Sequence, residues 1–131
     1  MIFEAGPRTP LVELTASSCL IRGECYPENI SEWSEPVLKT LEECLSQGQG
    51  QGQGQGEFKV DIELYYFNSS SAKFLFDFFE FLEESAEGGK AITINWRYRA
   101  EDDTMQEAGE DFEEDLSACA YNMVLVEDES K

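Results

Sequence analysis

The chain has 131 residues, and its 9 basic and 28 acidic side chains give a formal net charge of −19 at pH 7. This length suits one domain, and the charge would repel nucleic-acid phosphates and anionic lipid, so neither is expected as a partner. The chain has no histidine, which excludes catalytic sites with a histidine base and histidine metal ligands, and no cofactor is expected.

The amino-terminal stretch begins irregularly and has neither the basic nor the apolar segment of a signal peptide. No run in the chain approaches the ~20 apolar residues that a membrane span needs, so we expect a cytoplasmic protein. Residues 11–15 and 19–25 are then predicted as two short strands, with a hairpin turn over residues 16–18.

A helix is predicted after the second strand. Asn29 can cap its first turn, and Glu32, three residues later, completes a capping-box pattern. Pro36 is expected to kink this helix or to push its regular part later. The helix has one apolar stripe with members four residues apart. These are Trp33, Val37, Leu41 and Leu45.

Residues 47–56 repeat Gln-Gly and contain no apolar side chain. This composition predicts a flexible surface loop rather than a domain boundary, because the 46 residues before it are too few for a separate core. The repeat could tether a partner or could be a tolerated expansion of a repetitive coding tract. The low cost of lengthening a loop favours the second interpretation.

The second half of the chain predicts strands alternating with helices. Strands are expected over residues 58–67, 92–99 and 120–126, and helices over residues 70–87 and 103–116. Gly88 and Gly89 are expected to end the first of these helices with a left-handed backbone. The order β-β-α-β-α-β-α-β is typical of a single α/β domain, residues 1–131, with a mixed, mostly parallel sheet. Because each helix has one apolar stripe, the helices are expected mainly on one face of the sheet.

The most informative stretch is the strand-to-helix junction at residues 67–73, Phe-Asn-Ser-Ser-Ser-Ala-Lys. One of its small polar residues must cap the free N–H groups of the helix, and the others can direct hydroxyls to solvent. Ligands of α/β folds gather at this edge of the sheet. A phosphoryl group on Ser69 would add about 1.5 to 2 negative charges near the positive end of the helix dipole, within reach of Lys73.

Two segments of the chain resemble the SiaC family of bacterial regulatory phosphoproteins. They are Tyr26-Pro27-Glu28-Asn29 and residues 64–73, Leu-Tyr-Tyr-Phe-Asn-Ser-Ser-Ser-Ala-Lys. Residues 87–90 and 96–98 extend the similarity, which covers roughly residues 9–126. The resemblance implies a STAS-like fold, similar to that of anti-anti-sigma proteins.

The resemblance also implies a function in partner switching. In that family a Ser/Thr kinase and a PP2C-type phosphatase set the phosphorylation of the residue directly after the Asn, which is Ser69 here. The unphosphorylated protein activates a diguanylate cyclase and so promotes c-di-GMP signalling and biofilm behaviour. The best-known member has Thr at this position, which leaves Ser70 and Ser71 open as acceptors. The implied partner surface consists of Asn68, Ser70, Ser71, Lys73, Phe74, Tyr26, Pro27, Glu28 and Asn29.

The helix after the junction is apolar on more than one side. Its core stripe is Leu75, Phe78, Phe79 and Leu82, and Phe74, Phe76 and Phe81 lie off the centre of that stripe. Packing beneath a neighbouring helix and docking of a partner both explain these three side chains.

Two other functions stay open: an anti-anti-sigma factor that sequesters an anti-sigma kinase, and a small enzyme that uses Asp61 and Glu63.

Arg97 and Arg99 share a strand face and could bind phosphate, but ion pairs with the abundant carboxylates are favoured. A solvated surface is favoured over a cation site for the acidic helix at residues 103–116. The cysteines form no CxxC pair, and buried, reduced thiols are expected. They are Cys19, Cys25, Cys44 and Cys119.

Overall fold

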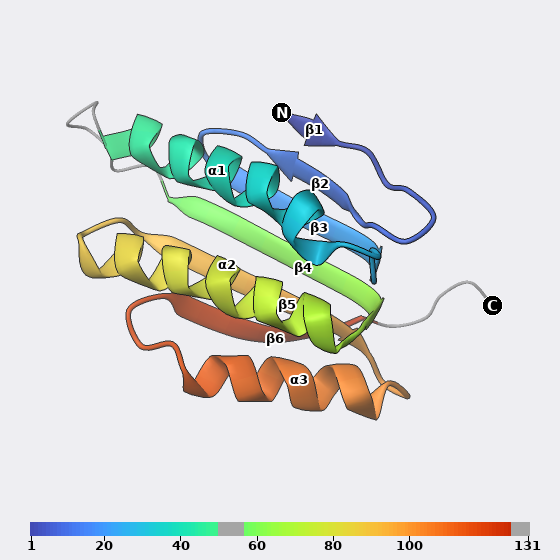
Figure 1. Cartoon of the computed structure of the whole chain (residues 1–131). Coiled ribbons are helices and arrows are strands. Elements are labelled where there is room, and N and C mark those ends of the chain that lie inside the picture. The colour runs from blue at the N-terminus through green and yellow to red at the C-terminus, as the bar shows by residue number, and fades with distance from the viewer. Residues whose placement is uncertain (50–56, 127–131) are drawn as a thin grey trace.

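A computed structural model describes residues 1–49 and 57–126. One six-stranded sheet contains β1 (Ile2–Phe3), β2 (Leu11–Leu14), β3 (Ser18–Cys25), β4 (Phe58–Phe67), β5 (Ile92–Arg99) and β6 (Ala120–Val126). The helices are α1 (Ile30–Gln49), α2 (Ser69–Glu87) and α3 (Asp103–Glu114), as Figure 1 shows.

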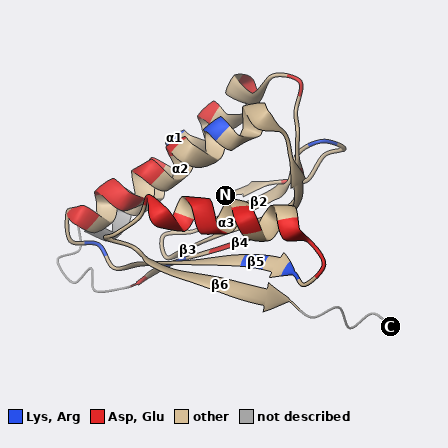
Figure 2. Cartoon of the chain, turned by 90° about the horizontal axis from the view of Figure 1, so that it is seen from below, with Lys and Arg blue, Asp and Glu red and all other residues tan. Residues whose placement is uncertain are grey.

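The strands lie in the sheet in the same order as in the chain. β1, β2 and β3 pair antiparallel, and β3 to β6 pair parallel, each parallel pair being connected through one helix. All three helices lie on one side of the sheet (Figure 2). The predicted α/β fold with a mixed, mostly parallel sheet is therefore confirmed, and a STAS-like arrangement is consistent with it. β1 was not predicted, because two residues are too few to show a periodic pattern.

The core lies between the sheet and the helices. On β4, Phe58, Val60, Ile62 and Leu64 are buried, while the intervening side chains are exposed or half-buried, as expected for a strand with one covered face. All four cysteines are free and buried, which agrees with the prediction of reduced thiols.

α1 begins directly after Asn29, whose Oδ1 accepts a hydrogen bond from the Glu32 N–H at 3.1 Å. The helix runs without interruption through Pro36, so the expectation that its regular part starts later is wrong. The Asn29 cap stabilises the first turn, and Pro36 costs the helix only one backbone N–H donor. The helix also continues through residues 47–49, where a loop was predicted. The rest of the predicted Gln-Gly loop lies outside the described residues.

α2 ends as predicted at two glycines. The Gly89 N–H donates to the Ala86 carbonyl at 3.0 Å, and the Lys90 N–H donates to the Ser85 carbonyl at 3.1 Å. These two bonds form a Schellman motif, which requires a left-handed residue at Gly89, where φ is +113°.

The face of the sheet without helices carries ion pairs. Arg97 lies 3.1 Å from Asp61, and both Arg22 and Arg99 lie within 4.0 Å of Glu63. The preferred interpretation of the two strand arginines, pairing with carboxylates, is confirmed for this face.

Candidate functional site

The two segments that suggested the family meet at one edge of the sheet. β3 and β4 are parallel neighbours, and Cys25, the last residue of β3, lies opposite Phe67, the last residue of β4. The chain continues from these positions into Tyr26 and Asn68, and the Asn68 N–H donates to the Cys25 carbonyl at 3.3 Å. The fold therefore places residues 26–29 beside residues 68–73.

Asn68 caps α2. Its backbone is extended, with φ −96° and ψ −179°, and its Oδ1 accepts a hydrogen bond from the Ser71 N–H at 3.0 Å. Capping by a residue of the polar run was predicted, and the structure assigns it to Asn68, which makes Ser69 the first residue of the helix. The first turn of α2 contains no acidic residue.

The three serines of this turn lie in different environments. Ser69 and Ser70 are exposed, whereas Ser71 has no exposed surface. Its buried Oγ makes no hydrogen bond of ordinary geometry and lies beside the Cys25 thiol. Burial raises the pKa of Cys25, and the contact with Ser71 lowers it by less. A kinase could not reach Ser71, so its assignment to the partner surface and its candidacy as a phosphate acceptor are both wrong.

Phe74 is also misplaced by the sequence-based prediction. It is 2% exposed, and its ring packs edge-on against Trp33 of α1 at a centroid distance of 5.0 Å. The neighbouring helix covers this side of α2, so Phe74 is a core residue and not part of a partner surface. Lys73 is exposed, and its Nζ lies 3.6 Å from the Asp77 carboxylate, one turn further along α2.

Two aromatic rings lie at the same edge of the sheet as the serines. Tyr26 packs edge-on against Tyr66 with the ring centroids 5.5 Å apart, and the Tyr26 hydroxyl donates to the Pro7 carbonyl at 3.4 Å. Tyr66 is half exposed, and Pro27 is half-buried. Tyr26 and Pro27 therefore lie at the same edge as Ser69 and keep part of their surface accessible.

The last two residues of the Tyr-Pro-Glu-Asn segment are exposed but differ in their contacts. Glu28 forms an ion pair with Arg8 at 3.1 Å between two exposed side chains, which contributes little to stability. Asn29 caps α1 in the way that Asn68 caps α2. The two asparagines that the resemblance singled out thus both orient helix starts at this edge.

Sequence reasoning missed an irregularity in β4. The pairing of β3 with β4 passes from Gly23 opposite Leu64 to Glu24 opposite Tyr66, which leaves Tyr65 as an extra residue. Such a bulge re-aims the side chains that follow it. The bulge brings the Tyr66 ring against the Tyr26 ring. The residue that could have indicated the bulge from the sequence is Gly23 of the paired strand β3, where φ is +127°.

The chemistry available at this edge is that of the exposed hydroxyls of Ser69 and Ser70. Among the described residues, no group of cysteine, aspartate and glutamate side chains is arranged to hold a metal ion. No helix within residues 1–49 or 57–126 is long and apolar enough to cross a membrane. Exposed hydroxyls at the positive end of a helix, with no carboxylate in its first turn, suit the attachment of a phosphoryl group.

Residues 3–126 match the family described as SiaC family regulatory phosphoprotein. The chain belongs to the SiaC family. It is also similar to an uncharacterized protein of Pseudomonas aeruginosa strain UCBPP-PA14, with 33% identity over 97 residues, or 74% of this chain and 72% of that protein.

Solved structures of SiaC share the fold of this chain. The crystal structure of apo-SiaC from Pseudomonas aeruginosa has a TM-score of 0.81 and 28% identity, covering 95% of this chain and 97% of that one. A chain in the crystal structure of the diguanylate cyclase SiaD in complex with its activator SiaC, from the same species, has a TM-score of 0.85 and 26% identity. That match covers 96% of this chain and 99% of the other.

Proposed function

We propose that this SiaC-family protein binds and activates a diguanylate cyclase when Ser69 is unphosphorylated and loses this binding when Ser69 carries a phosphoryl group. The observation that carries the proposal is the exposed Ser69 hydroxyl at the first position of α2, directly after the Asn68 cap. Family membership supports the regulatory role, and the SiaC–SiaD complex supports a cyclase as the partner.

The phosphoryl group would change the partner surface without unfolding the domain. It would lie at the positive end of the α2 dipole, and Lys73 follows one turn later, so the added charge suits the helix. A partner group packed against the hydroxyl or the N-terminal turn would instead meet about two negative charges. The docked state is therefore destabilised while the folded state is preserved.

The proposal includes the enzymes that would set this state. A Ser/Thr kinase would phosphorylate Ser69, or Ser70 as the second exposed acceptor, and a PP2C-type phosphatase would reverse the reaction. The protein would act in the cytoplasm as a single-domain adaptor without an enzyme activity of its own.

The test measures c-di-GMP synthesis by the purified cyclase of the same organism in the presence of parent protein, Ser69→Ala and Ser69→Asp. We expect Ser69→Ala to activate as the parent does and to resist inhibition by the kinase, and Ser69→Asp to lose activation by tenfold or more, about 1.4 kcal/mol of binding. Ser17→Asp, which adds the same charge at an exposed serine on the opposite edge of the sheet, is the matched control and should activate as the parent does. Equal activation by parent and Ser69→Asp, with both folded, would reject the switch.

A further inference from the structure

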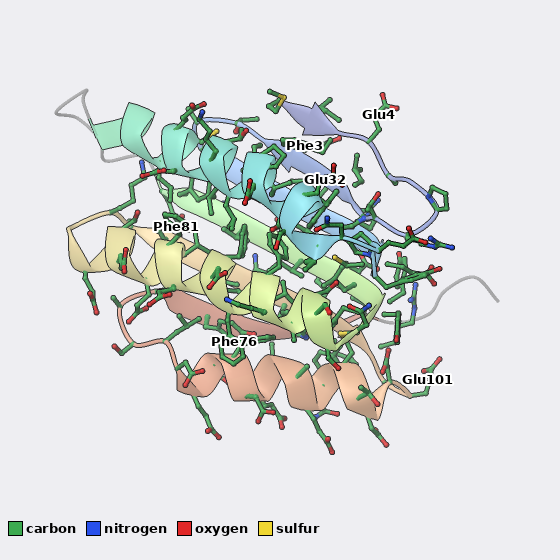
Figure 3. All side chains as sticks on the ribbon, in the orientation of Figure 1. Phe3, Glu4, Glu32, Phe76, Phe81 and Glu101 are labelled. Carbon is green, nitrogen blue, oxygen red and sulfur yellow. The ribbon has the colours of Figure 1, made fainter. Side chains whose placement is uncertain are left out.

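A groove lies between α2 and α3, on the helical side of the molecule. It encloses about 430 Å³, and its floor includes Phe76 from α2 and Phe112 and Leu116 from α3 and the residues after it. The Phe76 ring is 53% exposed and packs edge-on against Phe112 with a centroid distance of 5.3 Å. Figure 3 shows Phe76 on the side of α2 that faces α3. We refer to this feature as the α2–α3 groove.

Carboxylates border the α2–α3 groove. Glu80, Glu84 and Glu87 lie along its α2 side, and none of them takes part in an ion pair within the described part of the chain. The last turns of α2 and α3 contain no basic residue. These charges therefore add to the negative ends of two helix dipoles, an arrangement that a cationic partner would relieve.

Glu83, on the same stretch of α2, has a different role. Its carboxylate accepts hydrogen bonds from the Ser117 and Ala118 N–H groups, each at 2.9 Å, and from the Ser117 hydroxyl at 3.0 Å. Burial raises its pKa, but these hydrogen bonds lower it more, so the pKa lies below its ordinary value. Glu83 fixes the loop after α3 against α2 and holds the groove in shape.

The groove has the shape and chemistry to accept an amphipathic helix. The stretch of α2 from Phe76 to Glu87 is roughly 17 Å long at about 1.5 Å per residue, which corresponds to about three helical turns of a partner. Apolar side chains on the partner would cover Phe76, which is otherwise left in water. Lysine or arginine side chains beside them would pair with the rim carboxylates.

We infer that the α2–α3 groove binds an amphipathic helix of the regulated partner protein, with an apolar residue packed on Phe76 and basic residues facing Glu80, Glu84 and Glu87. The inference deepens the proposed function and rests on it only in that the protein acts by binding another protein. It adds a binding site remote from Ser69.

The two ends of α2 then select opposite charges. The Ser69 end has the positive dipole and Lys73, whereas the other end has the rim carboxylates. Ser69 and Glu84 are separated by about 22 Å along the helix, more than twice the Debye length of about 8 Å at physiological salt. Phosphorylation therefore repels an acidic group docked at the first turn, or disfavours a neutral one because the phosphate would lose its hydration, and leaves the attraction of basic residues to the groove unchanged.

The test titrates the protein into three fluorescein-labelled helical peptides of equal length and records fluorescence anisotropy at physiological salt. One peptide has a leucine stripe flanked by lysine and arginine, the second has the same stripe flanked by glutamate, and the third has the basic residues with serine in place of leucine. We expect the first peptide to bind at least about tenfold more tightly than the other two.

Variants of the protein locate the binding. Phe76→Ser and the double variant Glu80→Gln with Glu84→Gln should each weaken binding of the first peptide about tenfold. The matched control, Glu107→Gln with Asp111→Asn, removes two exposed carboxylates with the same i,i+4 spacing from α3, outside the groove, and should change the affinity less than twofold. Thermal unfolding confirms that each variant is folded, and Phe76→Leu, which keeps apolar bulk, should retain most of the affinity.

Unchanged binding by Phe76→Ser, or an equal loss in the two double variants, would overturn the inference, because the peptide would then be attracted by net charge alone. The assay contains neither cyclase nor phosphate. A negative result in this assay would not contradict the Ser69 switch, and a negative result with the Ser69 variants would not contradict binding at the α2–α3 groove.

Discussion

Ser69, Ser70 and Ser71 are adjacent and chemically identical, yet the fold gives them different roles. Ser69 and Ser70 face solvent, while Ser71 points its hydroxyl into the core beside Cys25. The sequence indicated that one residue of the run must cap the helix and that the others could be exposed. It could not indicate which serine turns inward, because that depends on how α2 is rotated over the sheet.

Replacing Ser71 with Ala should leave the free energy of unfolding unchanged or raise it by up to about 1 kcal/mol. The Oγ is buried without an ordinary hydrogen bond, so its removal relieves a desolvation penalty, and alanine favours the helix. Chemical denaturation monitored by circular dichroism measures this change. The control at the same helix end, Asn68→Ala, should instead lower stability by about 1 kcal/mol because it removes the cap. A large loss in Ser71→Ala would show that its hydroxyl is hydrogen-bonded.

At the level of the elements, the alternation of strands and helices could be predicted because each long segment has a clear period. For Phe74, the period left both packing beneath a neighbouring helix and docking of a partner open, and the family resemblance placed it on the partner surface. The packing alternative is the correct one, because α1 covers this side of α2, and that is a tertiary property. The β4 bulge at Tyr65 was missed because residues 64–67, Leu-Tyr-Tyr-Phe, are all apolar or aromatic, so no alternation remains there to reveal an extra residue. Close approach of α3 to the sheet was also missed, and Gly109 makes it possible.

Replacing Gly109 with Ala should lower the free energy of unfolding by about 1–3 kcal/mol, even though alanine is the better helix former. A Cβ at this position would lie 2.5 Å from Nε1 of Trp96 and 2.9 Å from the Met123 sulfur, so the rigid indole would have to move. That shift would also strain the hydrogen bond from Trp96 Nε1 to the Met105 carbonyl, which is 3.0 Å long.

Urea denaturation monitored by tryptophan fluorescence measures the effect of the Gly109 substitution. Gly88→Ala is the matched control, because a Cβ there meets no atom closer than 3.5 Å and φ is negative. A Gly109→Ala variant as stable as Gly88→Ala would contradict the close packing of α3.

Across the whole molecule, the two faces of the domain differ in charge. The open face of the sheet carries arginines paired with Asp61 and Glu63, whereas α3 contains acidic side chains and no lysine or arginine (Figure 2). The net charge of −19 was evident from the sequence, but its concentration on the helical side was not. That distribution arises because the three crossover helices share one face.

Increasing the NaCl concentration from about 0.05 M to about 0.5 M should raise the melting temperature by several degrees. Salt screens the mutual repulsion of exposed carboxylates, and about 1 kcal/mol of stability corresponds to roughly 4 °C in a domain of this size. Differential scanning calorimetry measures the shift. The double variant Glu107→Gln with Asp111→Asn should show a smaller response, and a melting temperature that falls with salt would contradict this account.

Because β3 to β6 are parallel, the connections that lead from a strand into a helix lie at the opposite edge of the sheet from those that lead from a helix into a strand. Every turn from strand to helix, including the one at Ser69, lies at one edge of the sheet, and α1 returns to β4 at the opposite edge (Figure 1). The ten residues of β4 span roughly 30 Å between these edges. A fluorophore attached at position 57, an exposed residue beside the start of β4, would therefore report on the protein without obstructing the Ser69 edge, where the proposed kinase and phosphatase would act.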